Sequence, residues 1–266
     1  MQAPDKVERI ISGSAAITEI LAELGLLDKV VAVDMYGTDV AGLSDDIETI
    51  DMLNPNAELL ISLEADLLLA SAMTRQGTED DPFAVVANTG VTVAYIPTAE
   101  SIEDICSDIR FIAELTGRKE QGEEIVAGME AEIAVIKEKA QQITEPKTVY
   151  FEVSPAPDLY SLGSGTYIHE LMEILGAKNI FGEQKGWLKV SEESVILANP
   201  HVILTCTNFL DDAIGEIMSR PAWSQITAVQ NGDVYYIDNN ASQRPSHRVI
   251  IALKEMAKAV YPEIYE

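Results

Sequence analysis

One stretch of this sequence occurs twice, and the repetition restricts the fold more than any other feature. The segment ELLISLEADLLLAS begins at Glu58, and ESVILANPHVILTCT begins 135 residues later at Glu193, with its glutamate, apolar and strand-like positions in the same order. A second pair, EILAELG at 19–25 and ELMEILG at 170–176, is separated by 151 residues. Two matching blocks in the same order indicate a duplicated architecture. The difference between the spacings predicts about 16 extra residues in the first copy, between Gly25 and Glu58.

Each copy alternates short apolar runs with helical patterns. The first copy has the strand-like runs VERIIS, KVVAVD, DLLLAS and VTVAYI, with helical patterns at 15–24, 56–63, 80–88 and 101–116. The second has strand-like runs at 148–153, 201–206 and 233–238, with helical patterns at 165–175, 191–198, 211–218 and 246–259. This rhythm is typical of parallel sheets covered by helices. We therefore expect an α/β fold with two similar lobes, each a mainly parallel sheet flanked by helices.

A long helical pattern separates the two copies. It runs from about Lys119 to Gln142, with Ile125, Met129, Ile133 and Ile136 on one stripe and charged residues elsewhere. Pro146 ends the pattern before a new strand begins. We therefore predict an N-terminal lobe at 1–118, a connecting helix at 119–143 and a C-terminal lobe at 144–266.

Composition restricts the partners of the chain. Its 44 acidic and 18 basic residues give a formal charge of −26, which opposes binding to nucleic acid or to anionic membranes. No apolar run reaches the ~18 residues that a membrane span needs. The strand-like run VERIIS follows Met1 so closely that we expect a targeting segment to be absent from this chain. The two cysteines, Cys106 and Cys206, predict buried free thiols rather than a disulfide framework or a thiolate metal site.

Six segments, in order along nearly the whole chain, resemble a known family. They are ERIISGSAAITEILAELGLLDKVVAVD, NAELLISLEADLLLAS, GSGTYIHELMEILGAKNIF, KVSEESVILANPHVILT, AWSQITAVQNGDVYYID and SQRPSHRVIIALKEMAKAVYPE. Together they are similar to the substrate-binding proteins of ABC importers for ferric siderophores, haem and cobalamin. The resemblance implies a monomeric, extracytoplasmic protein, free or lipid-anchored, with two lobes on a single long helix. It also implies a ligand cleft between the lobes and a dimeric permease that docks on both.

The resemblance gives the repeated glutamates a role. Family members present a surface glutamate on each lobe to basic residues of the permease dimer, and Glu58 and Glu193 occupy the matching positions. A two-fold partner offers the same basic pocket twice, so one carboxylate per lobe suits it. The alternative is that each glutamate only stabilises the N-terminus of its own helix. Glu192, beside Glu193, is the alternative docking residue in the second lobe.

Ligands of open α/β sheets bind at the carboxyl ends of the strands, and clefts between domains are favoured pockets. The candidate contact residues on the loops expected there are Tyr36, Met52, Arg75, Tyr95, Tyr167, Trp187, Phe209, Arg244 and His247, with Met73 and Tyr160 as further apolar candidates. The aromatic and sulfur side chains suit a flat apolar ligand such as haem, whereas Arg75 and Arg244 suit an anionic ferric siderophore. Trp223, in the segment AWSQI, is assigned to packing.

Met52 lies where some haem-binding relatives have an iron-ligating methionine, and His247 is a second candidate contact for an iron complex. A corrinoid is the alternative ligand. The other two histidines, His169 and His201, have no ligand spacing, so we expect no directly bound metal ion and no resident cofactor.

An enzyme is the competing class, because similar two-lobed folds include metal-inserting chelatases. The sequence has no Gly-rich phosphate loop, no Gly-x-Ser-x-Gly and no His-Glu-x-x-His motif. A chelatase would need a base such as His169 or His247 beside a carboxylate. We therefore expect a binding protein rather than an enzyme.

Overall fold

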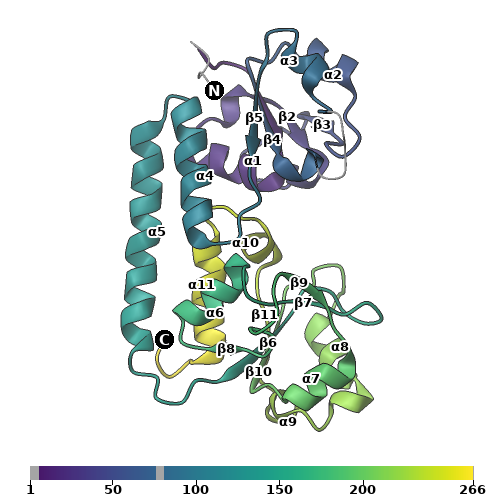
Figure 1. Cartoon of the computed structure of the whole chain (residues 1–266), viewed down its shortest axis with the longest axis vertical. Helices are drawn as coiled ribbons and strands as arrows, with labels where there is room; N and C mark the ends of the chain where they lie inside the picture. Colours follow the sequence, from purple (N-terminus) through teal and green to yellow (C-terminus); the bar gives the residue numbers. More distant parts are fainter. Residues whose placement is uncertain (1–5, 76–80, 266) are drawn as a thin grey trace. The chain divides into compact units, whose positions relative to one another are not determined.

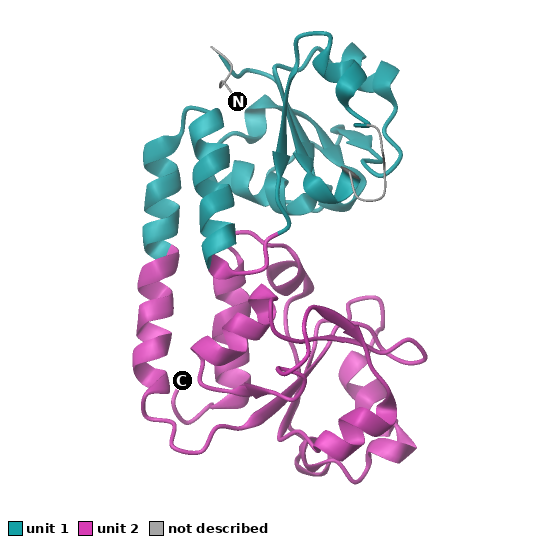
Figure 2. Ribbon diagram, in the orientation of Figure 1, with its two compact units in different colours: residues 1–98, 103–128 teal, residues 99–102, 129–266 magenta. Residues whose placement is uncertain are grey.

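The computed structural model describes residues 6–75 and 81–265, apart from the side chain of Arg75. The chain forms two compact units, shown in different colours in Figure 2. Unit 1 comprises residues 1–98 and 103–128, and unit 2 comprises residues 99–102 and 129–266. Helix α5 (Lys119–Ala140) contributes to both units, so the division by contacts falls inside this helix.

Unit 1 is built on a five-stranded parallel sheet (Figure 1). The strands are β1 (Ile10–Gly13), β2 (Val30–Asp34), β3 (Glu48–Ile50), β4 (Leu67–Ser71) and β5 (Thr92–Ile96), in the order β3-β2-β1-β4-β5. The helices are α1 (Ala15–Glu23), α2 (Ala57–Ser62), α3 (Ala84–Ala87) and most of α4 (Ile102–Leu115). The short 3-10 turns are η1 (Leu27–Lys29), η2 (Met35–Gly37) and η3 (Ala72–Arg75).

The central strands of unit 1 are apolar on both faces. Strands β1 and β4 are almost entirely buried, as expected for a parallel sheet that is covered on both sides. Strand β1 ends at Gly13, where a Cβ atom would lie 2.6 Å from the carbonyl oxygen of Leu69 and 2.8 Å from Cε of Met52. Only glycine fits this close approach. Helix α1 begins directly afterwards, with Ser14 as its N-cap.

Unit 2 repeats this plan. Its four-stranded parallel sheet has the order β11-β10-β6-β8, and a separate antiparallel pair is formed by β7 and β9. The strands are β6 (Thr148–Glu152), β7 (Tyr160–Leu162), β8 (Lys178–Asn179), β9 (Trp187–Lys189), β10 (Val202–Thr205) and β11 (Val234–Tyr236). The helices are α6 (Tyr167–Ile174), α7 (Glu192–Ala198), α8 (Ala213–Ser219), α9 (Thr227–Asn231), α10 (Asn239–Gln243) and α11 (Val249–Val260), with the 3-10 turn η4 (Pro221–Trp223).

The repeated sequence blocks form equivalent elements. The first block is α2 followed by β4, which pairs in parallel with β1, and the second is α7 followed by β10, which pairs in parallel with β6. The other repeated pair forms the C-terminal parts of α1 and α6. Each copy ends at a glycine with positive φ: Gly25 (69°) and Gly176 (84°). These left-handed glycines end their helices. The predicted α/β class, with parallel sheets flanked by helices, is confirmed.

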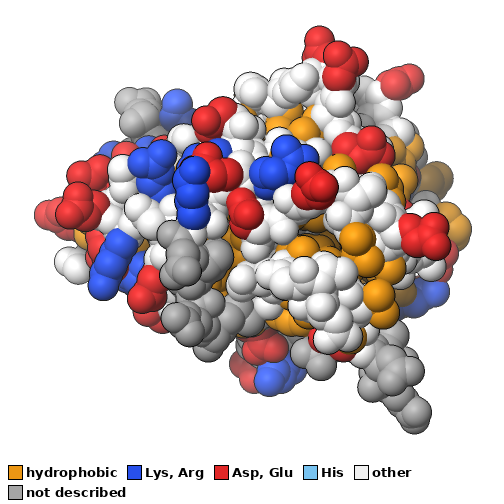
Figure 3. Space-filling view, turned by 90° about the horizontal axis from the view of Figure 1, so that it is seen from above, with side chains coloured by type: hydrophobic (Ala, Val, Ile, Leu, Met, Phe, Trp, Pro, Cys, Tyr) orange, Lys and Arg blue, Asp and Glu red, His pale blue; other side chains and the backbone are white. Residues whose placement is uncertain are grey.

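In the face drawn in Figure 3, acidic and basic side chains lie in several groups, and hydrophobic side chains are exposed among them, mainly in the right half of the view. Among the helices that the structure describes, none combines the length and hydrophobicity needed to cross a bilayer.

Candidate functional site

The carboxyl ends of the unit 1 strands carry exposed apolar side chains. Because all five strands are parallel, their carboxyl ends lie at one edge of the sheet. Met35 and Tyr36 follow β2, Leu53 follows β3 and Met73 follows β4, and between 48% and 67% of each side chain is exposed. Large apolar side chains grouped at one functional edge of a sheet are typical of a binding surface.

Met52 does not belong to this surface. It is only 2% exposed and packs in the core of unit 1, with its Cε close to Gly13. After β3 the carboxylate of Asp51 accepts hydrogen bonds from the backbone N–H groups of Leu53 (2.9 Å) and Asn54 (3.2 Å), which turns the chain. The turn directs Met52 inward and leaves Leu53 outside. Met52 is therefore a core residue, contrary to the expectation that it contacts a ligand or its iron, and its neighbour Leu53, which the sequence analysis missed, is the exposed residue of the two.

Two further candidate contact residues of unit 1 are Tyr95 and Arg75. Tyr95 is partly buried on β5, where its ring lies 6.1 Å from the ring of Phe83 and its hydroxyl donates a hydrogen bond to Asp81. Arg75 is the last residue of η3, and its side chain lies outside the described part of the structure.

In unit 2 the exposed aromatic side chains also follow strand ends. Phe209 lies in the loop after β10 and is 69% exposed. Tyr160 and Trp187 are exposed on the β7–β9 pair, which is hydrogen-bonded to Val153, the residue after β6. Phe209 therefore lies at the carboxyl end of the unit 2 sheet, with Tyr160 beside the end of β6, whereas Trp187 pairs with Leu162 at the other end of the β7–β9 pair.

Tyr167 is a packing residue. It is 3% exposed, and its hydroxyl donates a hydrogen bond of 2.9 Å to the backbone carbonyl of Ser242. Burial raises the pKa of this tyrosine well above its usual range. The expectation that Tyr167 contacts a ligand is thus corrected. Arg244 and His247, which lie between α10 and α11, are both partly exposed, with Arg244 as the C-cap of α10.

The two repeated glutamates lie in the first turns of equivalent helices, and both are exposed. In α2, Asn56 caps the helix and accepts hydrogen bonds from the N–H groups of Glu58 (3.0 Å) and Leu59 (3.2 Å). In α7 the cap is Ser191. The pKa of Glu193 is lowered by hydrogen bonds to its own backbone N–H and to the Ser191 hydroxyl, so this carboxylate is ionised at neutral pH.

Glu192 has a different environment from Glu193. Its Oε2 atom accepts a hydrogen bond of 2.9 Å from Nε1 of Trp223, an indole that is fully buried. A buried indole N–H needs a partner, and Glu192 supplies it. Glu192 therefore faces the protein, and Glu193 is the residue of this pair that faces solvent. The assignment of Trp223 to packing is confirmed.

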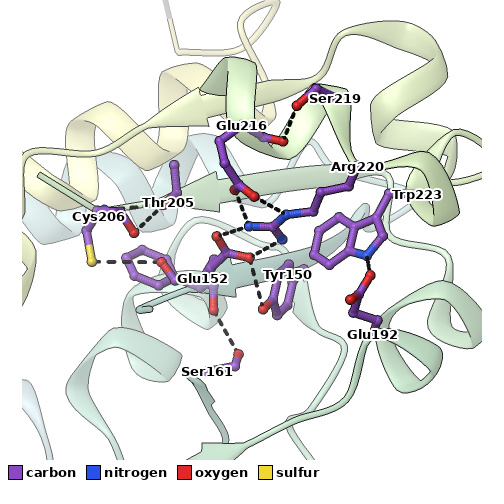
Figure 4. Close-up of polar contacts among 12 residues, drawn as sticks. Tyr150, Glu152, Ser161, Glu192, Thr205, Cys206, Glu216, Ser219, Arg220 and Trp223 are labelled. Carbon is purple, nitrogen blue, oxygen red and sulfur yellow. Dashed lines mark hydrogen bonds and ion pairs between the residues drawn. The ribbon is translucent and has the colours of Figure 1, made fainter. Parts of the chain in front are cut away.

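Figure 4 shows a cluster of polar contacts that includes this one and in which Glu152 and Arg220 are buried. We call it the Arg220 cluster and define it as Glu152, Glu216, Arg220, Trp223 and Glu192. Arg220 is 7% exposed and makes two parallel bonds to Glu152, from Nη1 to Oε2 (2.7 Å) and from Nη2 to Oε1 (2.9 Å). Its Nε also donates to Glu216 (3.0 Å). The sequence analysis missed this cluster, although the acidic end of the apolar run TVYFE and the spacing of Glu216 and Arg220 were visible signals.

The pKa values of Glu152 and Arg220 are both raised, but for different reasons. Desolvation raises the pKa of Glu152, an effect that the bonds from Arg220 oppose. Burial alone would lower the pKa of Arg220, but its bonds to Glu152 and Glu216 raise it further above its usual range. Arg220 therefore stays charged at every pH at which the fold persists.

Among the described residues, no three His, Cys, Asp or Glu side chains lie close enough together to hold a metal ion. His169 lies 3.5 Å from Glu173, and Nδ1 of His201 is hydrogen-bonded to Thr148. Cys106 and Cys206 are buried free thiols, as the sequence predicts.

Two α/β units, each with exposed apolar side chains at the strand ends, define a class of ligand-binding protein. Residues 10–241 match the family of periplasmic binding proteins, and the chain belongs to this family. The resemblance to substrate-binding proteins of ABC importers is thereby confirmed.

Curated relatives of the same kind are similar over nearly the whole chain. YvrC of Bacillus subtilis (strain 168), an uncharacterized ABC transporter substrate-binding lipoprotein, is 32% identical over 264 residues, covering 97% of this chain and 82% of YvrC. A vitamin B12-binding protein of Vibrio cholerae is 25% identical over 256 residues, covering 95% of this chain and 89% of the relative. Both relatives are binding proteins.

Solved structures give the same fold. A possible iron-binding periplasmic solute-binding protein from Staphylococcus epidermidis has a TM-score of 0.83 at 30% identity, covering 97% of this chain and all of that chain. The periplasmic heme-binding protein RhuT from Roseiflexus sp. RS-1 has a TM-score of 0.82 at 25% identity, covering 96% of this chain and 98% of that chain.

Proposed function

We propose that this protein captures an iron complex, a ferric siderophore or haem, outside the cytoplasmic membrane and delivers it to an ABC permease. The observation that carries the proposal is the set of exposed apolar and aromatic side chains at the carboxyl ends of both parallel sheets. The similarity to a possible iron-binding protein and to a heme-binding protein supports this ligand class. The lipoprotein YvrC supports an extracytoplasmic location.

The contact residues that we propose for the ligand are those that the structure leaves accessible: Tyr36, Leu53 and Met73 on unit 1, and Tyr160, Trp187 and Phe209 on unit 2. Arg244 and His247 stay in the proposal as polar contacts, because both are partly exposed. An apolar surface with a few charged groups suits a bulky complex whose metal is already enclosed by its own chelator. Such a ligand needs no cluster of protein metal ligands.

We further propose that Glu58 and Glu193 contact basic residues of the permease. Three features support the pair: equivalent positions in repeated helices, exposure to solvent, and the ionised state of Glu193. Arginine side chains bind such carboxylates through paired, charge-assisted hydrogen bonds. One such contact per unit matches a partner with two-fold symmetry.

A corrinoid is the second candidate ligand. The observation that favours it is the similarity to the vitamin B12-binding protein of Vibrio cholerae over 95% of this chain. Exposed aromatic side chains suit the face of a corrin ring as well as that of a porphyrin, so only a direct binding comparison separates the two ligands.

The test is a tryptophan-fluorescence titration with haemin, cyanocobalamin, ferric enterobactin and ferrichrome. The chain has two tryptophans, of which Trp187 is 49% exposed at the proposed surface and Trp223 is buried, so quenching should come from Trp187. The matched control is Trp187→Phe, and free tryptophan corrects for light absorbed by the probes. Saturable quenching by haemin or a siderophore supports the proposal, whereas binding of cyanocobalamin alone supports the corrinoid. Failure of all four probes to bind would contradict both.

A further inference from the structure

The Arg220 cluster contains none of the residues proposed for ligand contact or docking, yet it lies between the elements that carry both. Its core is a buried ion pair: Glu152, the last residue of β6, is 1% exposed, and Arg220 is 7% exposed. The two parallel bonds between them require one relative orientation of the planar guanidinium and the carboxylate. Breaking such a pair leaves an uncompensated buried charge, which is strongly unfavourable. The Glu152–Arg220 pair therefore opposes any shift of Arg220 relative to Glu152 more strongly than apolar contacts would.

One side of the cluster leads to the loop that carries Phe209, residues 206–212. The loop begins at Cys206, whose backbone N–H donates to the carbonyl of Glu152 (3.3 Å), and ends at Asp212, the N-cap of α8. The carbonyl of Asp212 accepts a hydrogen bond of 3.0 Å from the N–H of Glu216, and the carboxylate of Glu216 holds Arg220. Both ends of the loop are thus bonded to members of the cluster.

The other side leads to α7. The guanidinium carbon of Arg220 lies 4.2 Å from the centre of the Trp223 ring, a cation–π contact. The indole N–H of Trp223 is bonded to Glu192, the first residue of α7. The next residue is Glu193, the proposed docking carboxylate. In Figure 4 the side chains of Glu216, Arg220, Trp223 and Glu192 follow one another in this order.

We propose that Arg220 is a positioning residue that couples the Phe209 loop to helix α7, so that ligand binding changes the position of Glu193. This inference rests on the proposed function, because it links the proposed ligand surface to the proposed docking residue. A displacement of the loop moves the start of α8 and Glu216, and Arg220 follows because its buried charge needs both carboxylates. Because the indole of Trp223 stacks on Arg220 and is hydrogen-bonded to Glu192, α7 moves with Arg220. By linkage, permease binding then changes ligand affinity by the same factor.

The two tryptophans allow a direct test. Protein labelled with 5-fluorotryptophan should give two fluorine resonances, assigned with Trp187→Phe: one from the ligand surface and one from the buried Trp223. Suitable diamagnetic probes are gallium protoporphyrin, the gallium complexes of enterobactin and ferrichrome, and cyanocobalamin. A probe that binds should shift both resonances. In Arg220→Lys, which keeps the charge but not the planar fork, the Trp187 resonance should still shift and the Trp223 resonance should not.

A second readout and a milder variant keep the test decisive. Hydrogen exchange of the α7 amides should change about five-fold or more on ligand binding in the wild type, the lower end of common coupling factors. If Arg220→Lys does not fold, Glu216→Gln replaces it, because Glu216 is partly exposed and its loss leaves the Glu152–Arg220 pair intact. The matched control is Ser219→Ala on the same helix, whose hydroxyl bonds only the backbone carbonyl of Glu216 and which should behave as wild type.

The outcomes separate the two proposals. If Trp187 responds to a probe and Trp223 and α7 do not, the coupling is wrong and the ligand surface stands. An unchanged Trp223 response in the variant likewise excludes Arg220 as the coupling residue. If no probe shifts the Trp187 resonance, the proposed function fails, and the coupling that rests on it is rejected with it.

Discussion

Asp108 is a buried carboxylic acid on the amphipathic helix α4. The residue is 7% exposed, and α4 is otherwise held in place by apolar side chains such as Ile105, Ile109 and Ile112. Desolvation, together with the negative charge of Asp104 one turn earlier, raises the pKa of Asp108 to about 7 from an ordinary value of 3.8. The proton is therefore lost at a much higher pH than from an ordinary aspartate.

The raised pKa predicts a pH-dependent stability. Between about pH 4 and pH 7 the folded protein binds a proton that the unfolded chain has released, so this group makes unfolding easier as the pH rises. Asp108→Asn should therefore increase the free energy of unfolding at about pH 8 by roughly 1–4 kcal/mol, and by much less at about pH 4. Urea unfolding at both pH values measures the difference. Glu103→Gln, an exposed change on the same helix, is the control, and an equal gain from Asp108→Asn at both pH values would contradict the mechanism.

Neighbouring residues show how far the sequence could predict the site. Met52 and Leu53 are both apolar and adjacent, and their spacing does not reveal which one the chain buries. The carboxylate of Asp51 decides it by turning the chain. Tyr167 was misassigned for a similar reason, because its hydroxyl finds a backbone partner, the carbonyl of Ser242, 75 residues away in sequence.

At the scale of elements, α2 and α7 are short helices with the same design. Each has a polar N-cap, an exposed glutamate in the first turn, and a following strand that pairs with the first strand of its unit. Local spacing and capping residues are enough to predict such helices, and both were found near their predicted positions, 56–63 and 191–198. The short strands β3, β7, β8 and β9 were not predicted, because two or three residues carry too little periodicity.

The docking proposal predicts separable effects of the two glutamates. Glu58→Ala and Glu193→Ala should each weaken binding to the cognate permease in nanodiscs roughly ten-fold or more, as expected for loss of one partner of a charge-assisted pair, and the double variant should be weaker still. Glu120→Ala, an exposed first-turn change on α5, should have no effect. If the glutamates only stabilise their helices, each change will cost ~0.3–1 kcal/mol of stability and leave permease affinity unchanged.

For the whole molecule, the excess of negative charge governs long-range encounter. The formal charge of −26 repels anionic ligands and attracts a basic partner. Such a charge ordinarily keeps a protein soluble. It also makes association rates depend on salt concentration, and the sign of the ligand's charge decides whether added salt raises or lowers the rate.

Association with an anionic iron complex should therefore become faster as salt is added. Stopped-flow measurements with haemin or ferric enterobactin between about 20 mM and 200 mM ionic strength should show a several-fold increase in the association rate constant, because screening reduces the repulsion. Ferrichrome, which is neutral, should show little change. A rate that falls with salt would mean that local basic residues such as Arg244 outweigh the charge of the whole protein.

The sequence by itself determined most of the helices and the longer strands, the duplication, the family and the kinds of side chain at the strand ends, because these depend on local spacing and on residue order. Only the tertiary structure decided which of two neighbours is buried, as for Met52 and Leu53 or Glu192 and Glu193. It also assembled the Arg220 cluster from residues as far apart as Glu152 and Arg220, separated by 68 positions. Burial and ion pairing depend on partners that the fold brings from distant segments, and the spacing of residues along the chain does not record them.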